Sequence, residues 1–480
     1  MAAMTTLAEV QVMLPGSYLL NISAKEADKL MLSRVGTDSR QIDSGELFIA
    51  LTGERFDAHD FLVDVANSGA GAALVSDAKR CPDNLPAVCV PDTRVGLGEL
   101  AKAWRASHAI PLALVTGSNG KTTVKEMIAS IFKATAGEAH TLVTKGNLNN
   151  EIGLPLTLLK LRSTDALAVV ELGMNHPGET ALLASIAQAN IALINNAQRE
   201  HQEFMETVAA VAEEHADVIR ALPKNGIAVF PADSEFSGAW KVAAAGRKVI
   251  DFGLTSNPSN SGAAVSGYQL SNSCVQINLG SNSIEVQLNT LGTHNVRNAL
   301  AASAVALAAG ISLEKIKQGL EAFTPVNGRM QVKFSDSKYT LIDDSYNANP
   351  DSVRAAIDAL KQSGSIAWLV LGDMGEVGNQ GPEFHREVGA YAAEQGIAKL
   401  FALGDQCVFA MNGFDSAKTG VASSASHFTS VENLISKLNE ELRSHLASGN
   451  QHLNILVKGS RFMRMERVVQ ALLEEAKTCS

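Results

Sequence analysis

The chain has few of the features that mark secreted, zinc-binding or nucleic-acid-binding proteins. Its five cysteines show no C-x-x-C spacing, which argues against a disulfide framework or a zinc site. Its 40 lysine and arginine residues are outnumbered by 50 acidic residues and form no long basic block, so we expect no nucleic-acid partner. Binding of an acidic substrate would therefore depend on individually placed Lys and Arg side chains.

Membrane-directing segments are also missing from the sequence. No run of 18 apolar residues occurs, and the stretch MAAMTTLAEVQVMLPG has neither the basic start nor the continuous apolar core of a signal peptide. We therefore expect a cytoplasmic protein without a membrane span. A length of 480 residues with 46% hydrophobic and 19% charged residues is typical of a folded protein with several domains.

The segment LALVTGSNGKTTVKEMIASIF, residues 112–132, carries the first chemical signal. Its apolar start predicts a buried parallel strand, and the later apolar residues recur with the period of a helix that packs on the sheet. Glycines in the turn let backbone N–H groups converge on an anion at the helix N-terminus. Lys121 can reach the terminal phosphates of a nucleotide, and the Thr122 hydroxyl can bind the magnesium ion that they carry.

This turn departs from the pattern G-x-x-x-x-G-K-[ST], because Val115 stands where the first glycine should be. An ordinary glycine turn before a helix is the alternative. Glycines, a lysine and paired threonines between a strand and a helix favour a phosphate-binding loop. The ATP contacts expected from it are Gly117, Ser118, Asn119, Gly120, Lys121, Thr122 and Thr123.

Alternating apolar strands and helices predict an α/β fold of three domains. Residues 1–107 form a smaller N-terminal α/β domain, and residues 108–323 form a central domain with a parallel sheet of the P-loop ATPase type. Within the central domain, apolar residues alternate with polar ones on both sides of GSNS, which predicts a β-hairpin.

A boundary is expected at FTPVNGRM, residues 323–330, because this segment contains Pro and Gly and follows a strong helical pattern. The remainder, 324–480, offers the apolar runs WLVLGD, LFALGD and NILVKGS, each of which ends in glycine. Ligands of open α/β sheets bind at the carboxyl ends of such strands.

Two candidate metal ligands follow apolar strands of the central domain. Glu171 ends the strand of ALAVVELG, where an acidic residue commonly completes a nucleotide–metal site, although a solvated acid at a strand end is the alternative. His201 follows the next apolar strand, in NNAQREHQEF. Taken alone, a loop histidine is more often a surface residue than a ligand, and for His201 both possibilities stay open at nearly even odds.

Asparagine-rich segments supply further candidates. KGNLNNEIGLPLTLL contains Asn149 and Asn150 and is too polar for a core segment, so we expect substrate contacts there. LGTHNVRN places Asn295 and Asn298 at the opening of an alanine-rich helix. Helix capping is the structural alternative for these two, and recognition of a purine or ribose is the functional one.

A polar cluster follows the strand predicted at 340–342. It comprises Asp343, Asp344, Tyr346, Asn347 and Asn349. Asn349 would cap a helix that begins at Pro350, and the remaining members exceed what one cap needs. We therefore expect a functional loop that faces the nucleotide domain.

These residues together resemble a known family, the Mur ligases of peptidoglycan synthesis. The phosphate loop, Glu171, His201, the THNVRN asparagines, Arg329 and Asp344 occur in that family's order over nearly the whole chain. GNLNNEIGLPLTLL, DDSYNANPDS, LGDMGEVG and VKGSRFMRME resemble the member that adds D-alanyl-D-alanine to the UDP-N-acetylmuramoyl tripeptide. The DNPR signature of the member that adds diaminopimelate or lysine is not found.

The resemblance implies an ATP- and Mg²⁺-dependent ligase whose peptide substrates are UDP-N-acetylmuramoyl-tripeptide and D-alanyl-D-alanine. It implies a UDP-sugar domain at 1–107, an ATP-binding domain at 108–323 and a Rossmann-like dipeptide domain at 324–480, and we expect a monomer. By the same resemblance, Lys121, His201 and Arg329 are catalytic. The metal ligands would be Thr122, Glu171 and His201, and the further ATP contacts would be Asn295, Asn298, Arg329 and Asp344. The UDP sugar would contact Ser39, Arg40, Asp57 and His59. Further substrate contacts would be Asn149, Asn150, Tyr346, Asn347 and Asn349.

One stretch departs from the family pattern. Several relatives bridge two metal ions with a carbamoylated lysine about a dozen residues after the histidine, whereas VAAVAEEHADVI places either His215 or a glutamate there. The ligand of a second metal ion is therefore open.

Other activities share parts of this pattern. A folylpolyglutamate synthase belongs to the same wider superfamily, but its pteridine site gives no reason for DDSYNANP or for an N-terminal DSR segment. A GTPase, as a non-ligase P-loop NTPase, would show N-K-x-D, and the chain contains no Asn-Lys pair. A non-enzymatic scaffold would not need a phosphate loop, an acidic strand end and a distal Arg/Asp cluster together.

Overall fold

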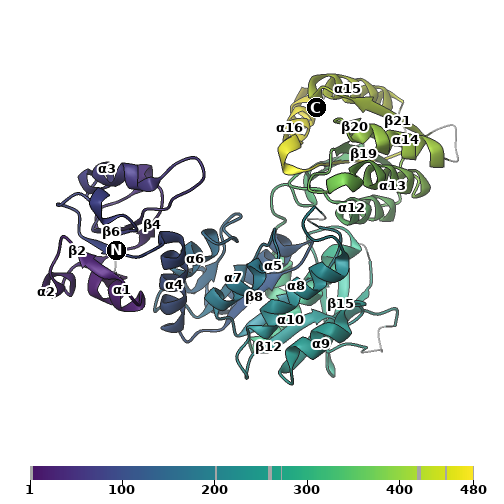
Figure 1. Cartoon of the computed structure of the whole chain (residues 1–480). Helices are drawn as coiled ribbons and strands as arrows, with labels where there is room; N and C mark the ends of the chain where they lie inside the picture. The colour runs from purple at the N-terminus through teal and green to yellow at the C-terminus, as the bar shows by residue number, and fades with distance from the viewer. Residues whose placement is uncertain are drawn as a thin grey trace.

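Three β-sheets with helices packed on them organise the chain (Figure 1). The structure is a computed structural model that describes residues 4–200, 203–257, 262–271, 273–418, 423–448 and 451–478. The N-terminal sheet has five strands, parallel except for β2, in the order β2 (Tyr18–Leu20), β7 (Ala87–Cys89), β6 (Ala72–Val75), β5 (Leu47–Ile49) and β4 (Val35–Gly36). A short ribbon pairs β1 (Thr5–Thr6) with β3 (Met31–Leu32), and the helices are α1 (Leu7–Met13), α2 (Ala24–Ala27) and α3 (Leu62–Asn67).

The central sheet has nine strands. Their order is β16 (Asn282–Gln287), β15 (Cys274–Leu279), β14 (Val265–Gln269), β13 (Lys248–Leu254), β12 (Ile227–Pro231), β11 (Ile191–Ile194), β8 (Leu112–Thr116), β10 (Leu167–Glu171) and β9 (Thr141–Val143). The strands from β14 to β9 are parallel, and β15 and β16 form the antiparallel hairpin that the alternating pattern predicts. Its helices are α5 (Lys121–Ala136), α6 (Gly153–Leu158), α7 (Glu179–Ala187), α8 (Val208–Arg220), α9 (Ser237–Ala244), α10 (Thr293–Ala308) and α11 (Leu313–Ala322).

The sheet is covered on both faces because its strands are apolar on both sides. Alternate residues of β8 enter two different cores, with Leu112 and Leu114 in one and Ala113 and Val115 in the other. The predicted apolar face of α5 belongs to the second core and is fully buried. Strand, turn and helix at residues 112–132 therefore form as the sequence predicts.

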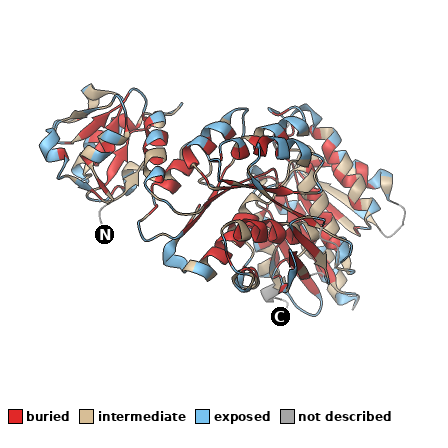
Figure 2. Cartoon of the chain, turned by 90° about the horizontal axis from the view of Figure 1, so that it is seen from below, coloured by how far each residue is buried: buried red, intermediate tan, exposed pale blue. Residues whose placement is uncertain are grey.

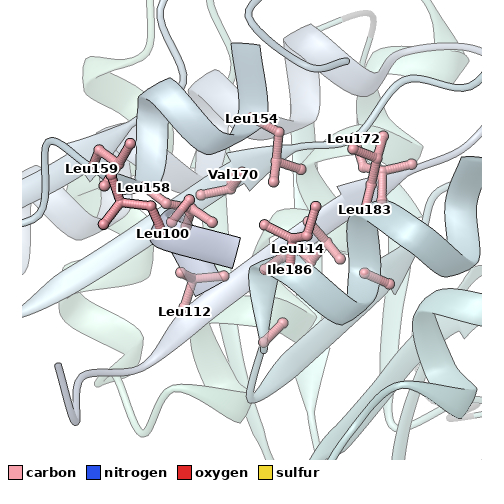
Figure 3. Close-up of a cluster of buried hydrophobic side chains, with 14 of the residues drawn as sticks. Leu100, Leu112, Leu114, Leu154, Leu158, Leu159, Val170, Leu172, Leu183 and Ile186 are labelled. Atoms are coloured by element: carbon pink, nitrogen blue, oxygen red, sulfur yellow. The ribbon is translucent and has the colours of Figure 1, made fainter. Parts of the chain in front are cut away.

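Helix α4 (Thr93–Ala106) joins the N-terminal and central domains. Leu100 of this helix lies with side chains of β8, β10, α6 and α7 in one buried cluster (Figure 3). Two glycines let it approach both sides closely. A Cβ on Gly96 would lie 3.1 Å from Leu74 of the N-terminal sheet, and one on Gly98 would lie 3.0 Å from Ile186 of α7. The two domains thus share one helix and one continuous core.

The C-terminal sheet has six strands, in the order β17 (Gln331–Ser335), β18 (Tyr339–Asp344), β22 (Leu453–Lys458), β19 (Ile366–Gly372), β20 (Lys399–Leu403) and β21 (Ser424–Phe428). Only β17 is antiparallel to its neighbour. The helices α12 (Pro350–Gln362), α13 (Gly381–Glu394), α14 (Cys407–Ala417), α15 (Val431–Ala447) and α16 (Glu466–Thr478) cover it. Helix α12 begins at Pro350 with Asn349 in a capping box, as predicted.

Burial follows this layered arrangement. Figure 2 shows buried residues along the strands and the inner faces of the helices, and exposed residues on the outer faces. No helix within the described ranges is long and apolar enough to cross a membrane. The expected α/β fold class with three domains is confirmed by the three sheets and by the structural comparisons given below.

Close packing of α13 on α14 leads to a stability prediction. A Cβ on Gly389 would lie 1.9 Å from the Ala410 carbonyl oxygen, a backbone atom that cannot yield without separating the helices. We expect Gly389→Ala to destabilise the C-terminal domain by roughly 1–3 kcal/mol, which urea unfolding would measure as a lower midpoint. Gly238→Ala is the control, because Gly238 has open space around its Cβ position in α9. An unchanged midpoint for Gly389→Ala would contradict this packing.

Candidate active site

A cavity of about 680 Å³ lies where the central and C-terminal domains meet. The loops after β8, β10 and β11 and the start of α10 form one wall, and the linker at Gly328 to Met330 with the loop between β18 and α12 forms the other. Both walls are rich in polar and charged side chains. The volume is in the range of small-molecule sites.

The phosphate loop projects its backbone into this cavity. Gly117 has a φ of +136° and Gly120 a φ of +77°, conformations that residues with side chains rarely adopt. A Cβ on Gly120 would also lie 2.7 Å from the Asn298 side chain. Helix α5 begins directly afterwards at Lys121, so its unsatisfied N–H groups face the cavity. The loop therefore has the backbone geometry of an anion site.

The Lys121 side chain folds onto the phosphate loop and hydrogen-bonds to it. Its Nζ donates to the carbonyl oxygens of Gly117 at 2.6 Å and Ser118 at 3.3 Å, and it lies 3.2 Å from Glu200 Oε2. The two carbonyl oxygens satisfy hydrogen bonds of this partly buried ammonium group, and the Glu200 carboxylate balances its charge. A triphosphate would offer stronger charge-assisted acceptors to the same group.

A buried chain of amides supports the phosphate loop from below. Asn195 Nδ2 donates to the Asn119 carbonyl and to Asn298 Oδ1, and Asn298 Nδ2 donates to Asn295 Oδ1. Asn295 in turn donates to Thr290 and to the Leu291 carbonyl. Neither asparagine caps α10, whose N-cap is Gly292 without a side-chain bond, so capping is the wrong explanation for this pair. Both line the cavity.

Glu171 has the environment of a metal ligand. It ends β10 with 3% of its surface exposed, and its Oε1 accepts a hydrogen bond of 2.8 Å from Asn149 Nδ2. Its Oε2 is buried and has no hydrogen-bond partner. A buried carboxylate oxygen without a partner is costly unless a cation occupies the space in front of it. Glu171 and the Thr122 hydroxyl, which lines the same cavity, thus fit a magnesium ion.

The loop that carries Asn149 is anchored by a buried lysine. Lys125 Nζ donates to the Thr144 carbonyl at 2.8 Å, and Thr144 Oγ1 accepts from the Glu171 backbone N–H. Asn150 lines the cavity as Asn149 does, and its Oδ1 also accepts from the backbone of Ile152 and Gly153 at the start of α6. Of this asparagine pair, Asn149 touches the candidate metal ligand and Asn150 stabilises a helix start.

The C-terminal wall contributes two cations. The Arg329 guanidinium stacks on the Tyr346 ring at 4.1 Å, and its buried Nε has no hydrogen-bond partner. Lys458 is 3% exposed and donates to Asp344 Oδ2 at 2.6 Å and to the Asn347 carbonyl at 3.0 Å. Both Asp344 oxygens are occupied, since Oδ1 accepts from the Met330 N–H. Of these two cations, Arg329 is thus the one with a buried nitrogen that lacks a hydrogen-bond partner, and it lines the cavity.

Polar contacts join the two walls directly. Asn349 Nδ2 donates to Asn119 Oδ1 at 2.9 Å, so the predicted loop does face the nucleotide domain. Arg199, in the loop after β11, binds Asp351 of α12 at 2.6 Å and Glu387 of α13 at 2.6 Å. It also lies over the Phe384 ring. The Arg199 hydrogen bond holds the pKa of Glu387 below its usual value.

The expected UDP-sugar residues lie in the N-terminal domain and do not line this cavity. Arg40 has 84% of its side chain exposed and pairs with Asp38 at 2.8 Å. His59 is buried, with its Nδ1 2.6 Å from Asp57 Oδ1 and its Nε2 accepting from the Ser76 N–H. Of these four residues, His59 is buried, Ser39 and Asp57 are half-buried, and Arg40 is exposed.

His201 lies outside the described residues, whereas His215 and Glu214 of the segment VAAVAEEHADVI lie within them. His215 is completely buried on α8, where Nδ1 contacts Thr116 Oγ1 at 3.1 Å and Nε2 contacts Glu200 Oε1 at 3.0 Å. The neighbouring Glu214 instead accepts from the backbone of Gly178 and Thr180 at the start of α7. Of the two residue types expected at the bridging position, the histidine is the one that reaches the cavity, through Glu200.

Sequence reasoning missed several residues of this site, namely Glu200, Arg199, Lys458, Asn195 and Asn196. Glu200 directly precedes the histidine that was singled out, and Lys458 ends an apolar run that was noted only for its glycine. The available signal was position, since Lys458 is the last residue of β22 and the other four lie in the loop after β11, at the carboxyl ends of buried parallel strands.

A second polar cluster lies within the C-terminal domain, outside the cavity. Asp373, His385 and Cys407 lie close enough to hold a metal ion. Asp373 already accepts from the backbone N–H groups of Gln406 and Cys407, and His385 accepts from the Met374 N–H and donates to the Gly381 carbonyl. Burial raises the pKa of the Cys407 thiol. The cluster is accounted for by hydrogen bonds within the C-terminal domain.

Comparison with known proteins assigns the family. Residues 115–306 match the Mur ligase middle domain, residues 328–461 the Mur ligase glutamate ligase domain, and residues 32–105 the Mur ligase family catalytic domain. The chain belongs to the Mur ligase family. The resemblance inferred from the sequence motifs is confirmed.

Relatives within the Mur ligase family cover almost the whole chain. UDP-N-acetylmuramoyl-tripeptide–D-alanyl-D-alanine ligase of Escherichia coli K12 is 39% identical over 464 residues, which is 96% of this chain and 98% of that protein. The protein of the same name from Bacillus subtilis 168 is 32% identical and covers 93% of this chain and 94% of its own length. The expectation of an amide ligase is thereby confirmed.

Solved structures agree with this assignment. A crystal structure of MurF from Acinetobacter baumannii superposes with a TM-score of 0.87 at 33% identity and covers 98% of this chain and 99% of that one. MurF ligase from Thermotoga maritima, solved in complex with ADP, superposes with a TM-score of 0.80 at 24% identity, covering 93% and 98%. The second match supports the fold alone.

Lys121 gives the first prediction for this Mur ligase site. Lys121→Ala removes the ammonium group nearest to the phosphate loop, so turnover should fall by roughly 10²-fold or more. Lys133→Ala, on the exposed side of the same helix, is the matched control and should keep wild-type turnover. Phosphate release under saturating ATP measures both. A Lys121→Ala enzyme with near wild-type turnover would rule out the phosphate loop as the site.

Proposed function

We propose that the chain joins D-alanyl-D-alanine to UDP-N-acetylmuramoyl-tripeptide in an ATP-dependent amide ligation. The observation that carries this proposal is the match of nearly the full chain to ligases of this name, at 39% identity for the Escherichia coli protein. The cavity at the junction of two domains supports it, because a ligase must bring a nucleotide and two peptides together there.

The proposed reaction activates a carboxylate before an amine attacks it. The terminal carboxylate of the tripeptide attacks the γ-phosphorus of ATP, the bond to ADP breaks, and an acyl phosphate forms. The D-alanyl-D-alanine amine then attacks the acyl carbon, loses a proton, and phosphate leaves with the bonding electrons. No nucleophilic side chain is required. Lys121 and Arg329, with its unpaired Nε, would spread the charge of the phosphoryl group.

A magnesium ion is part of the proposal. Thr122 and Glu171 would hold this ion, and the ion would neutralise phosphate charge during transfer. His201 would belong to a second metal position. Asn149 keeps the Glu171 carboxylate oriented through its 2.8 Å hydrogen bond. Metal-ligating carboxylates are commonly fixed by hydrogen bonds of this kind.

Each domain receives one role in the proposal. Residues 1–107 bind the UDP sugar through the surface around Ser39 and Arg40, residues 108–323 bind ATP, and residues 324–480 bind the dipeptide. The proposed substrates suggest a reaction in the cytoplasm, and we expect the chain to act as a monomer. Folylpolyglutamate synthase of Mycobacterium tuberculosis, at 17% identity, shares the fold alone.

The direct test is phosphate release measured with each substrate left out in turn. We expect ADP and phosphate to accumulate only when ATP, UDP-N-acetylmuramoyl-tripeptide and D-alanyl-D-alanine are all present, with pentapeptide formed in equal amount. Replacing the tripeptide by a folate with glutamate should give no product. Turnover with folate and glutamate, or phosphate release from ATP alone at the full rate, would overturn the proposal.

The role of the N-terminal domain gives a separate prediction. Arg40→Ala should raise the KM for the nucleotide-sugar peptide and leave kcat and the KM for ATP less affected, because a lost contact that is equal in ground and transition states appears in KM. Lys29→Ala, another exposed cation of the same domain, serves as control. A rise in the KM for ATP would show that Arg40 serves ATP binding, and the role proposed for the N-terminal domain would then be wrong.

A further inference from the structure

Glu200 is the one acidic residue that contacts the phosphate-loop lysine in the described part of the cavity. Its Oε2 lies 3.2 Å from Lys121 Nζ, and its Oε1 lies 3.0 Å from the ring Nε2 of His215. Glu200 is 6% exposed and His215 is completely buried. A carboxylate held this firmly where phosphates are expected needs a physical reason.

His215 fixes the direction of this carboxylate. A neutral imidazole satisfies both of its contacts when Nδ1 accepts from the Thr116 hydroxyl and Nε2–H donates to Glu200. Because Thr116 is the last residue of β8 and His215 lies on α8, two rigid elements orient the pair. His215 therefore acts through Glu200.

A bound triphosphate changes the balance of charge. Lys121 can serve the terminal phosphates only by leaving its present acceptors, which include Glu200. Glu200 would then face a polyanion, in the same cavity where Glu171 Oε2 already lacks a partner. Two buried carboxylates beside a triphosphate repel it and each other unless divalent cations lie between them.

We infer that Glu200 is a ligand of a second divalent cation at the terminal phosphate and that His215 is its positioning residue. The inference rests on the proposed binding of ATP at the phosphate loop. It also explains how the site can lack the carbamoylated lysine of several relatives, whose position in VAAVAEEHADVI has no lysine. The Glu200 side chain would supply the carboxylate that the carbamate supplies in those relatives. Carboxylate oxygens are the ligands that Mg²⁺ and Mn²⁺ prefer.

Metal counting tests the inference without relying on turnover. Free Mn²⁺ is read by electron paramagnetic resonance with the full chain and a non-hydrolysable ATP analogue. We expect two Mn²⁺ ions per chain for the wild type. Glu200→Gln should weaken the second ion by about 10-fold or more, and Glu203→Gln, an exposed acid three residues on, should leave both in place. Two ions bound with unchanged affinity in Glu200→Gln, or one ion in the wild type, would overturn the inference.

Two further measurements guard against misfolding. ADP lacks the terminal phosphate, so Glu200→Gln should bind it as the wild type does. If that variant lost ADP binding, the wild type would be tested in buffer freed of CO₂ and bicarbonate. Two Mn²⁺ ions retained there would support the inference. Loss of one ion would overturn it, because a ligand derived from CO₂ would then hold the second ion. His215→Gln should keep more of the second site than His215→Ala, because it can still donate to Glu200.

These outcomes are separate from those of the ligation assay. A chain that binds two Mn²⁺ ions but does not join the two peptides would contradict the proposed substrates and leave Glu200 as a metal ligand. A chain that joins them while Glu200→Gln keeps both ions would contradict only the inference.

Discussion

The ion-pair cluster around Arg199 is the interaction on which the shape of the cavity depends. One guanidinium from the central domain binds two carboxylates of the C-terminal domain, Asp351 and Glu387, and Arg354 also binds Glu387. The fully buried core residues of the central and C-terminal domains form separate clusters, although Leu291 of the central domain packs against the C-terminal one. Polar contacts of this kind therefore help to hold the two walls at their distance. The planar fork of arginine suits this task because it meets both carboxylates at defined angles.

The loop after β11 connects this cluster to the phosphate site. Arg199 holds the C-terminal domain, and the adjacent Glu200 holds Lys121 and His215. Gln198 bonds to Ser118 and Asn119 of the phosphate loop. A charge that enters beside Lys121 thus meets Glu200, which is one peptide bond away from Arg199, the residue that binds the C-terminal domain.

The sequence patterns correctly predicted those elements whose structure depends on interactions between residues close together in the chain. The strand, turn and helix around Lys121, the hairpin of β15 and β16 and the Asn349 cap each depend on neighbouring residues. The Asp344–Lys458 and Arg199–Asp351 pairs were missed because 114 and 152 residues separate their members. Asn298 resembles a helix cap in sequence, and only the folded loop above it shows that it supports Gly120.

Helix α4 has a mechanical consequence for the substrate. Gly96 and Gly98 let its sides touch both the N-terminal sheet and α7, and Leu97 and Leu100 belong to a core that runs through both domains. The N-terminal and central domains are therefore joined by packed side chains. In the proposed reaction, the helix would therefore set the distance between the UDP-sugar site and the phosphate loop. A substrate bound by its uridine end would bring its terminal carboxylate to the phosphates only if the peptide between these two ends had the matching length.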